Sequence, residues 1–124
     1  MCVVLLIEVD ELVRDTLIKA LSRQGHDVEA TGDVHHAMEW LKHNEPDVVM
    51  TELIVGHGTS GAMILEHVHR ICPKAMKILM SGHPVLDSRV HTHAHDVYLA
   101  KPFSARVIAS TFADFTTPQS VRAA

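Results

Sequence analysis

The sequence of 124 residues predicts an α/β fold, a doubly wound five-stranded parallel sheet with helices on both faces. Two observations predict it. Short runs rich in Val and Ile alternate with longer segments whose apolar residues recur at helical spacing. The runs are also continuously apolar, which is typical of strands that are buried on both faces of a sheet. Because crossovers between parallel strands are right-handed, a doubly wound sheet is the economical topology.

The first strand and helix are the clearest elements. The run VVLLI at residues 3–7 is bounded by acids and indicates a buried strand. Residues 11–25 then predict a helix that stops at Gly25, a residue favoured at helix C-termini. Five apolar residues of this segment are expected on one inward stripe: Leu12, Val13, Leu17, Ile18 and Leu21.

The same alternation continues to the end of the chain. Strands are expected at residues 27–31, 47–52, 76–81 and 97–100. Helices are expected at residues 34–44, 61–71, 85–94 and 104–115. In the helix at 34–44, Ala37, Met38 and Leu41 should face inward. We therefore expect one domain over residues 1–117 and a frayed tail over 118–124.

Composition excludes several classes of protein. With 47% apolar and 21% charged residues, the chain is expected to be globular rather than disordered. The net charge of −4 and the scattered basic residues argue against a nucleic-acid-binding face. The two cysteines have no metal-binding spacing, and the apolar start is too short for a signal peptide or a membrane span. We expect a cytoplasmic protein that does not act at a membrane.

Chemically useful side chains follow four of the predicted strands. Glu8 and Asp10 come after the first strand. Glu52, in the stretch PDVVMTEL, ends the third strand. Ser81 ends the fourth strand, and Lys101 follows the fifth. The carboxyl ends of parallel strands share one edge, where such sheets place their functional crevice. Carboxylates there can hold Mg²⁺, and a lysine beside a hydroxyl suits a phosphoryl group.

The chain resembles the response-regulator receiver domains of two-component signalling from Val4 to about Phe115. The motifs that carry this resemblance occur in order: LVRDTLIKALSRQGHDV, PDVVMTEL, GTSG, KILMSGH and YLAKPF. The resemblance implies a flavodoxin-like (βα)5 fold with strand order 2-1-3-4-5. It also implies phosphorelay chemistry, in which a histidine kinase transfers a phosphoryl group, with Mg²⁺, to an aspartate that ends the third strand.

Position by position, the resemblance assigns roles to three residues. Lys101 matches the invariant lysine, Ser81 the conserved Ser or Thr, and Tyr98 the aromatic switch residue. The Lys101–Pro102 bond matches one that is usually cis. Plain edge-strand packing is the alternative for Tyr98.

Two positions depart from the family pattern. Glu52 stands at the phosphoacceptor position, where the family has aspartate, and Val9 stands where the family has the acid that touches the metal. Glu8 is an acceptable variant of the first acid, whereas Asp10 starts one residue too late to replace the second fully. We therefore expect no bound metal and no cofactor. Glu8, Asp10 and Glu52 would be ligands only if the site still binds Mg²⁺.

These departures predict a pseudo-receiver, a signalling module without enzymatic activity that acts as a protein-interaction adaptor. Glu52 either imitates the phosphorylated state, through bonds to Lys101 and Ser81, or simply pairs with Lys101 and locks the site. The alternative is an active phosphoacceptor that receives a phosphoryl group from a histidine kinase. A more distant alternative is a metal or pH sensor built on histidines, of which His91 and His95 are four residues apart.

The expected partner is a signalling protein, either a histidine kinase or a downstream effector. It should bind the face formed by residues 85–112, and a homodimer is left open. Flavin binding is disfavoured because acids occupy the place of a phosphate-cradling loop after the first strand.

Overall fold

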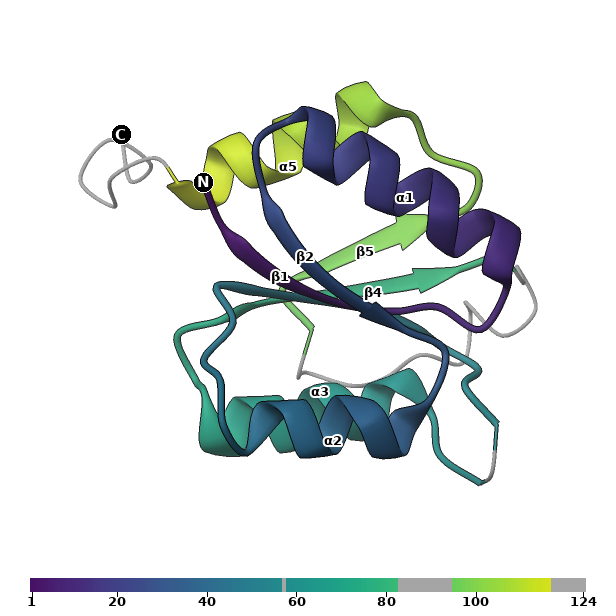
Figure 1. The fold of residues 1–124 in the computed structure, drawn as a ribbon, viewed down its shortest axis with the longest axis vertical. Coiled ribbons are helices and arrows are strands. Elements are labelled where there is room, and N and C mark those ends of the chain that lie inside the picture. The colour runs from purple at the N-terminus through teal and green to yellow at the C-terminus, as the bar shows by residue number, and fades with distance from the viewer. Residues whose placement is uncertain (57, 83–94, 117–124) are drawn as a thin grey trace.

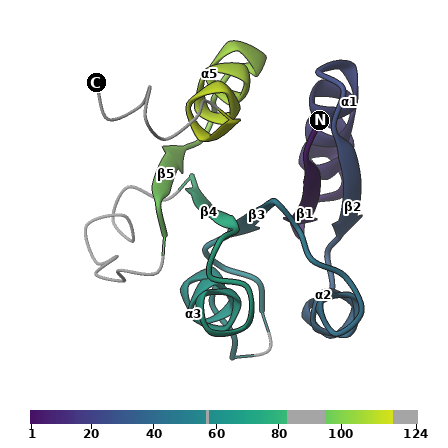
Figure 2. The same cartoon turned by 90° about the vertical axis from the view of Figure 1, so that its left-hand side faces the viewer.

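The computed structural model describes residues 1–56, 58–82 and 95–116 (Figure 1). Of residues 115 and 116 it describes the backbone alone. It contains one sheet of five parallel strands in the order β2-β1-β3-β4-β5, which confirms the predicted fold class and strand order (Figure 2). The strands are β1 (Val3–Ile7), β2 (Asp27–Thr31), β3 (Val48–Glu52), β4 (Met76–Ser81) and β5 (Val97–Ala100).

The described residues contain four helices: α1 (Glu11–Arg23), α2 (Val34–Leu41), α3 (Gly61–Ile71) and α5 (Ala105–Thr116). Helices α1 and α5 cover one face of the sheet, and α2 and α3 cover the other (Figure 2). The helix predicted over 85–94 lies outside the described residues. No helix in the described part of the chain is long and apolar enough to cross a membrane.

Helix α2 ends earlier than the sequence predicts, whereas α1 stops before Gly25, the predicted C-terminal signal. Helix α2 stops at Leu41 rather than residue 44, because the next backbone bonds tighten: Lys42 N–H donates to Glu39 O at 3.2 Å and His43 N–H to Trp40 O at 3.1 Å. Such bonds span three residues instead of four and close a helix. Helix α1 ends at Arg23, since Gly25 has a φ of +87°, a left-handed conformation that terminates the helix.

The core has two layers, one on each face of the sheet. Along β1, Val4 and Leu6 join the layer under α1 and α5, while Leu5 and Ile7 join the layer under α2 and α3. All four side chains are fully buried. Burial on both faces explains why this strand is continuously apolar instead of alternating.

The predicted inward stripe of α1 is wrong at Leu12. Leu17 and Leu21 are buried, whereas Leu12 is 76% exposed. Leu21 comes nine positions after Leu12, which places the two side chains roughly 180° apart around the helix. Leu12 therefore faces outward near the start of α1.

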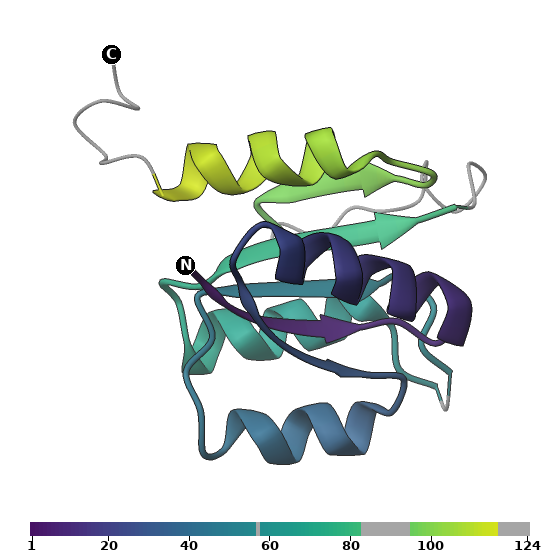
Figure 3. The ribbon, with the colours of Figure 1, turned by 45° about the horizontal axis from the view of Figure 1, so that its top comes forward.

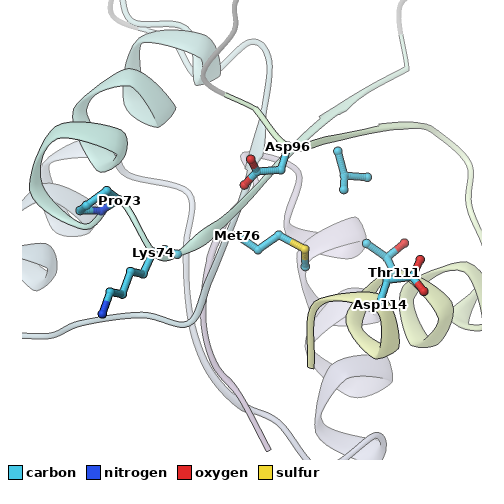
Figure 4. Close-up of a pocket in the computed structure, with 8 residues that line it drawn as sticks. Pro73, Lys74, Met76, Asp96, Thr111 and Asp114 are labelled. Atoms are coloured by element: carbon cyan, nitrogen blue, oxygen red, sulfur yellow. The ribbon is translucent and has the colours of Figure 1, made fainter. Parts of the chain in front are cut away.

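The amino-terminal edge of the sheet holds a buried lysine and a surface hollow. Lys77 Nζ donates to Ala75 O at 2.6 Å, and the Lys77 backbone N–H donates to Asp96 Oδ2 at 2.8 Å. These bonds attach the start of β5 to the turn before β4. Beside them, Asp96, Met76 and Thr111 line part of a hollow of about 510 Å³ that is open to solvent (Figure 4).

His26 joins α5 to the start of the sheet. Its Nδ1 accepts a hydrogen bond from Cys2 N–H at 3.1 Å, and its ring centroid lies 4.7 Å from that of the buried Phe112. Burial, with a smaller contribution from the amino-terminal charge, lowers the pKa of His26 below 6.5. This environment therefore favours the neutral imidazole, whose Nδ1 can accept the hydrogen bond.

His26 should make the fold less stable in mild acid. Because its folded pKa is lowered, its stabilising contribution is complete above pH 6.5 and is lost as the pH falls below that value. In His26→Asn the side-chain oxygen can still accept from Cys2 but does not titrate. Thermal midpoints measured between about pH 7.5 and pH 5 should fall less in the variant than in the wild type. Parallel curves would contradict this role, since the two proteins differ only at position 26.

Candidate functional site

The carboxyl edge of the sheet brings the predicted site residues together. The strands run in one direction, so their carboxyl ends lie at the same edge of the sheet (Figure 3). Glu8 follows β1, Glu52 ends the adjacent β3, Ser81 ends β4, and Lys101 follows β5. Glu8, Glu52 and Ser81 are 2%, 8% and 0% exposed, so three polar groups are buried at one place.

A single ammonium group connects the two acids. Lys101 Nζ donates one hydrogen bond to Glu8 Oε1 and another to Glu52 Oε2. The remaining oxygen of Glu8, Oε2, accepts from the Asp10 backbone N–H at 3.2 Å. Two carboxylates therefore share one cation, and this Glu8–Lys101–Glu52 network has one more negative than positive charge when both acids are ionised.

Burial and the hydrogen bonds of the network shift the pKa values of Glu52 and Lys101. Burial raises the pKa of Glu52, and the charge of Glu8 raises it further, although the hydrogen bond from Lys101 acts in the opposite direction. Burial alone would lower the pKa of Lys101, but its hydrogen bonds to Glu52 and Glu8 outweigh burial and raise it. Lys101 is thus held in its charged form, while Glu52 is the acid that takes up a proton more readily than usual.

Backbone contacts place both glutamates. Arg14 Nη1 donates to Glu8 O, the backbone carbonyl of the first acid, at 2.8 Å. At the other acid, α3 starts against the strand end: a Cβ on Gly61 would lie 2.0 Å from Glu52 O. Only glycine allows this close approach. Sequence reasoning missed both functions, although an arginine one turn after the α1 N-cap and a glycine at the start of α3 were visible signals.

The residues at this edge do not fit a magnesium ion. Mg²⁺ prefers about six oxygen ligands in near-octahedral geometry. Val9 supplies no side-chain oxygen, and both glutamates are occupied by Lys101. The Asp10 carboxylate instead caps α1 by accepting from Val13 N–H at 3.1 Å. Among the described residues, no group of three or more His, Cys, Asp or Glu side chains is arranged to hold a metal.

The other predicted residues have clear positions, but their roles stay predictions. Tyr98 is half-buried on β5 and packs against the layer under α2 and α3. Its ring centroid lies 6.3 Å from that of His95, edge to face. The Lys101–Pro102 peptide bond is cis, as the resemblance implied. His91, half of the suggested histidine pair, lies outside the described residues.

Removing the shared cation should expose the cost of the two buried acids. Lys101→Met should lower the free energy of unfolding by about 3 kcal/mol at neutral pH, because two like charges then face each other without a partner. The loss should shrink in acid, at about pH 4, because the raised pKa of buried Glu52 favours its protonation there. Urea unfolding at both pH values measures this difference. Adding Glu52→Gln to the same chain should recover part of the loss, and a Lys101→Met protein as stable as wild type would contradict the network.

Comparisons with known proteins agree with this geometry. The model of the response regulator receiver domain family matches residues 4–113. The transcriptional regulator NtrC of Azospirillum brasilense is 27% identical over 109 residues, which cover 86% of this chain and 22% of NtrC. AfsQ1 of Streptomyces coelicolor, a transcriptional regulatory protein, is 27% identical over 105 residues, covering 84% of this chain and 46% of its own. The chain thus spans about a fifth to a half of these relatives.

Solved structures share the fold. A response regulator receiver domain protein from Clostridium thermocellum superposes with a TM-score of 0.84 at 21% identity, covering 98% of both chains. NtrX from Brucella abortus gives a TM-score of 0.85 at 18% identity, covering 98% of this chain and 28% of NtrX. With the family match over most of its length, the chain belongs to the response regulator receiver domains of two-component signalling.

Proposed function

We propose that this receiver domain is a protein-interaction module whose phosphorylation site is held in one fixed state. The observation that carries the proposal is the shared ammonium group of Lys101, which donates to Glu8 and Glu52 together. In this arrangement the side chain at the acceptor position is already engaged. The module then signals by what it binds, rather than by cycles of phosphorylation.

Three physical features support the loss of ordinary phosphorylation. Glu52 is one methylene longer than aspartate, which changes the reach and angle of the attacking oxygen. Its side chain is 10% exposed and bonded to Lys101, so attack would require breaking a buried ion pair. Val9 removes the oxygen ligand that the family pattern places beside Glu8. Without that ligand, a metal could not neutralise the charge that develops during transfer.

The same contact supports two versions of the fixed state. A phosphoryl group on aspartate would reach further than aspartate itself and add negative charge. Glu52 also reaches further and bonds to Lys101, so it can imitate part of that state. In the simpler version the ion pair only locks the site. A functional readout separates them: Glu52→Gln would remove a built-in signal in the first version and change little in the second.

The partner-binding face remains the one predicted from the sequence, residues 85–112, of which the structure describes 95–112. A largely apolar groove of about 330 Å³ supports this assignment. Pro102 and Phe103 lie on one side of it and Leu12, exposed at 76%, on the other. Receiver domains bind histidine kinases and effector domains, and an apolar side chain of such a partner fits this groove.

Phosphoryl analogues test the proposal directly. We expect the wild-type protein to form no stoichiometric adduct when it is incubated with acetyl phosphate, or with beryllofluoride, in the presence of Mg²⁺. Intact mass and amide NMR shifts around Glu52 and Ser81 are the measurements. An adduct at Glu52 would overturn the fixed-state proposal and favour a working phosphoacceptor.

Restoring the two acids should restore the metal site. The double variant Val9→Asp with Glu52→Asp should bind Mg²⁺, because it regains an oxygen ligand beside Glu8 and shortens the side chain that reaches Lys101. Calorimetric titration with MgCl2 measures binding, and Glu52→Asp alone is the matched control, which should bind weakly. If the double variant also ignores Mg²⁺, Val9 is not the position of the missing acid.

A further inference from the structure

Arg14 is a second cation at the carboxyl edge, and it contacts backbone instead of carboxylates. It lies on the second turn of α1, and its Nη1 donates to Glu8 O at 2.8 Å and to Val9 O at 3.4 Å. These carbonyls belong to the segment in which the chain leaves β1 and enters α1. Arg14 therefore binds the backbone of Glu8, whose side chain belongs to the Glu8–Lys101–Glu52 network.

Gly32 provides the space for this contact. A Cβ at Gly32 would lie 2.8 Å from Arg14 Nη1 and 3.3 Å from Glu8 O. Gly32 is not among the glycines with positive φ, so its backbone does not require glycine. Space for the guanidinium is the remaining physical reason. Gly32 directly follows β2, whose Thr31 O accepts from Glu8 N–H at 3.0 Å, so three segments meet around Glu8.

The contacts fix Glu8 from both sides. Arg14 holds its carbonyl, and the Asp10 backbone N–H holds its Oε2, which leaves Oε1 directed to Lys101. We propose that Arg14, seated on Gly32, is a positioning residue that holds Glu8 toward Lys101 and so keeps the network closed. This inference rests on the fixed site of the proposed function, and it names what fixes it.

The guanidinium suits this task better than an ammonium group would. It is planar, stays charged at all relevant pH values and presents its donors in a rigid fork. The charge stays outside the carboxylate pair, so Arg14 does not compete with Lys101 for Glu8 Oε1. Arg14 and Lys101 thus have separate functions: the first orders the loop and the second neutralises the acids.

Competitive acetylation of lysines tests the proposal with a local readout. The full chain is treated with limiting acetic anhydride, and peptide mass spectrometry gives the rate at each lysine. Lys101 should react slowly in the wild type, because an ammonium that donates to two carboxylates is not nucleophilic. Lys42, with a side chain 68% exposed, is the fast reference. Lys77, with a side chain 4% exposed at the opposite edge, reports general loosening of the fold.

Two variants and one control define the outcomes. Arg14→Met removes the hydrogen bond to Glu8 O, and Gly32→Ala displaces the guanidinium while keeping its charge. Each should raise the acetylation rate at Lys101 relative to Lys42 on the order of tenfold. Losing one charge-assisted hydrogen bond changes an equilibrium constant by about this factor. The rate at Lys77 should not change. The matched control Arg23→Met, at an exposed arginine in the last turn of α1, should leave both rates unchanged.

Two results would overturn the proposal. An unchanged rate at Lys101 would show that Glu8 does not need Arg14, and a joint rise at Lys101 and Lys77 would make Arg14 a general stability residue. Either result is distinct from failure of the fixed-state function. That failure would appear as a beryllofluoride adduct on the wild-type protein, whatever the acetylation rates of the variants.

Discussion

Two carboxylates buried on adjacent strands repel each other, and the structure of this site depends on how that repulsion is met. Glu8 and Glu52 are almost fully buried at the ends of β1 and β3, where water screens little of their charge. Lys101 supplies the opposing positive charge from the end of β5, two strands away from β3. The strand order is therefore part of the electrostatics of the site.

The same interaction links the fold to the proposed signalling role. A receiver that switches needs acids that are free to hold a metal and to accept a phosphoryl group. Here Glu8 and Glu52 both accept hydrogen bonds from Lys101, and Val9 offers no side-chain oxygen. Next to Lys101, an exposed Leu12 and the turn at Pro102 and Phe103 border a groove. A fixed site beside an apolar groove is consistent with recognition of another protein.

Sequence patterns predicted the strands well and the helix surfaces less well. Strands buried on both faces are continuously apolar, so VVLLI and its counterparts were readable without knowledge of their neighbours. Helix α2 ended three residues early, because its last turn is set by local hydrogen bonds rather than by apolar spacing. Leu12 matched the apolar composition of α1 but not its buried stripe, since the direction of a stripe depends on which face the sheet covers.

The sequence by itself determined the order of strands and helices, the family motifs, and the chemical departures at Glu52 and Val9. These are local properties, because each depends on residues that are close together in the sequence. Only the tertiary structure decided which groups meet. Lys101 bonds to partners 49 and 93 residues away, and the guanidinium of Arg14 fits a space left by Gly32 on another strand end. Contacts of this kind depend on strand order and side-chain direction, and no run of neighbouring residues encodes them.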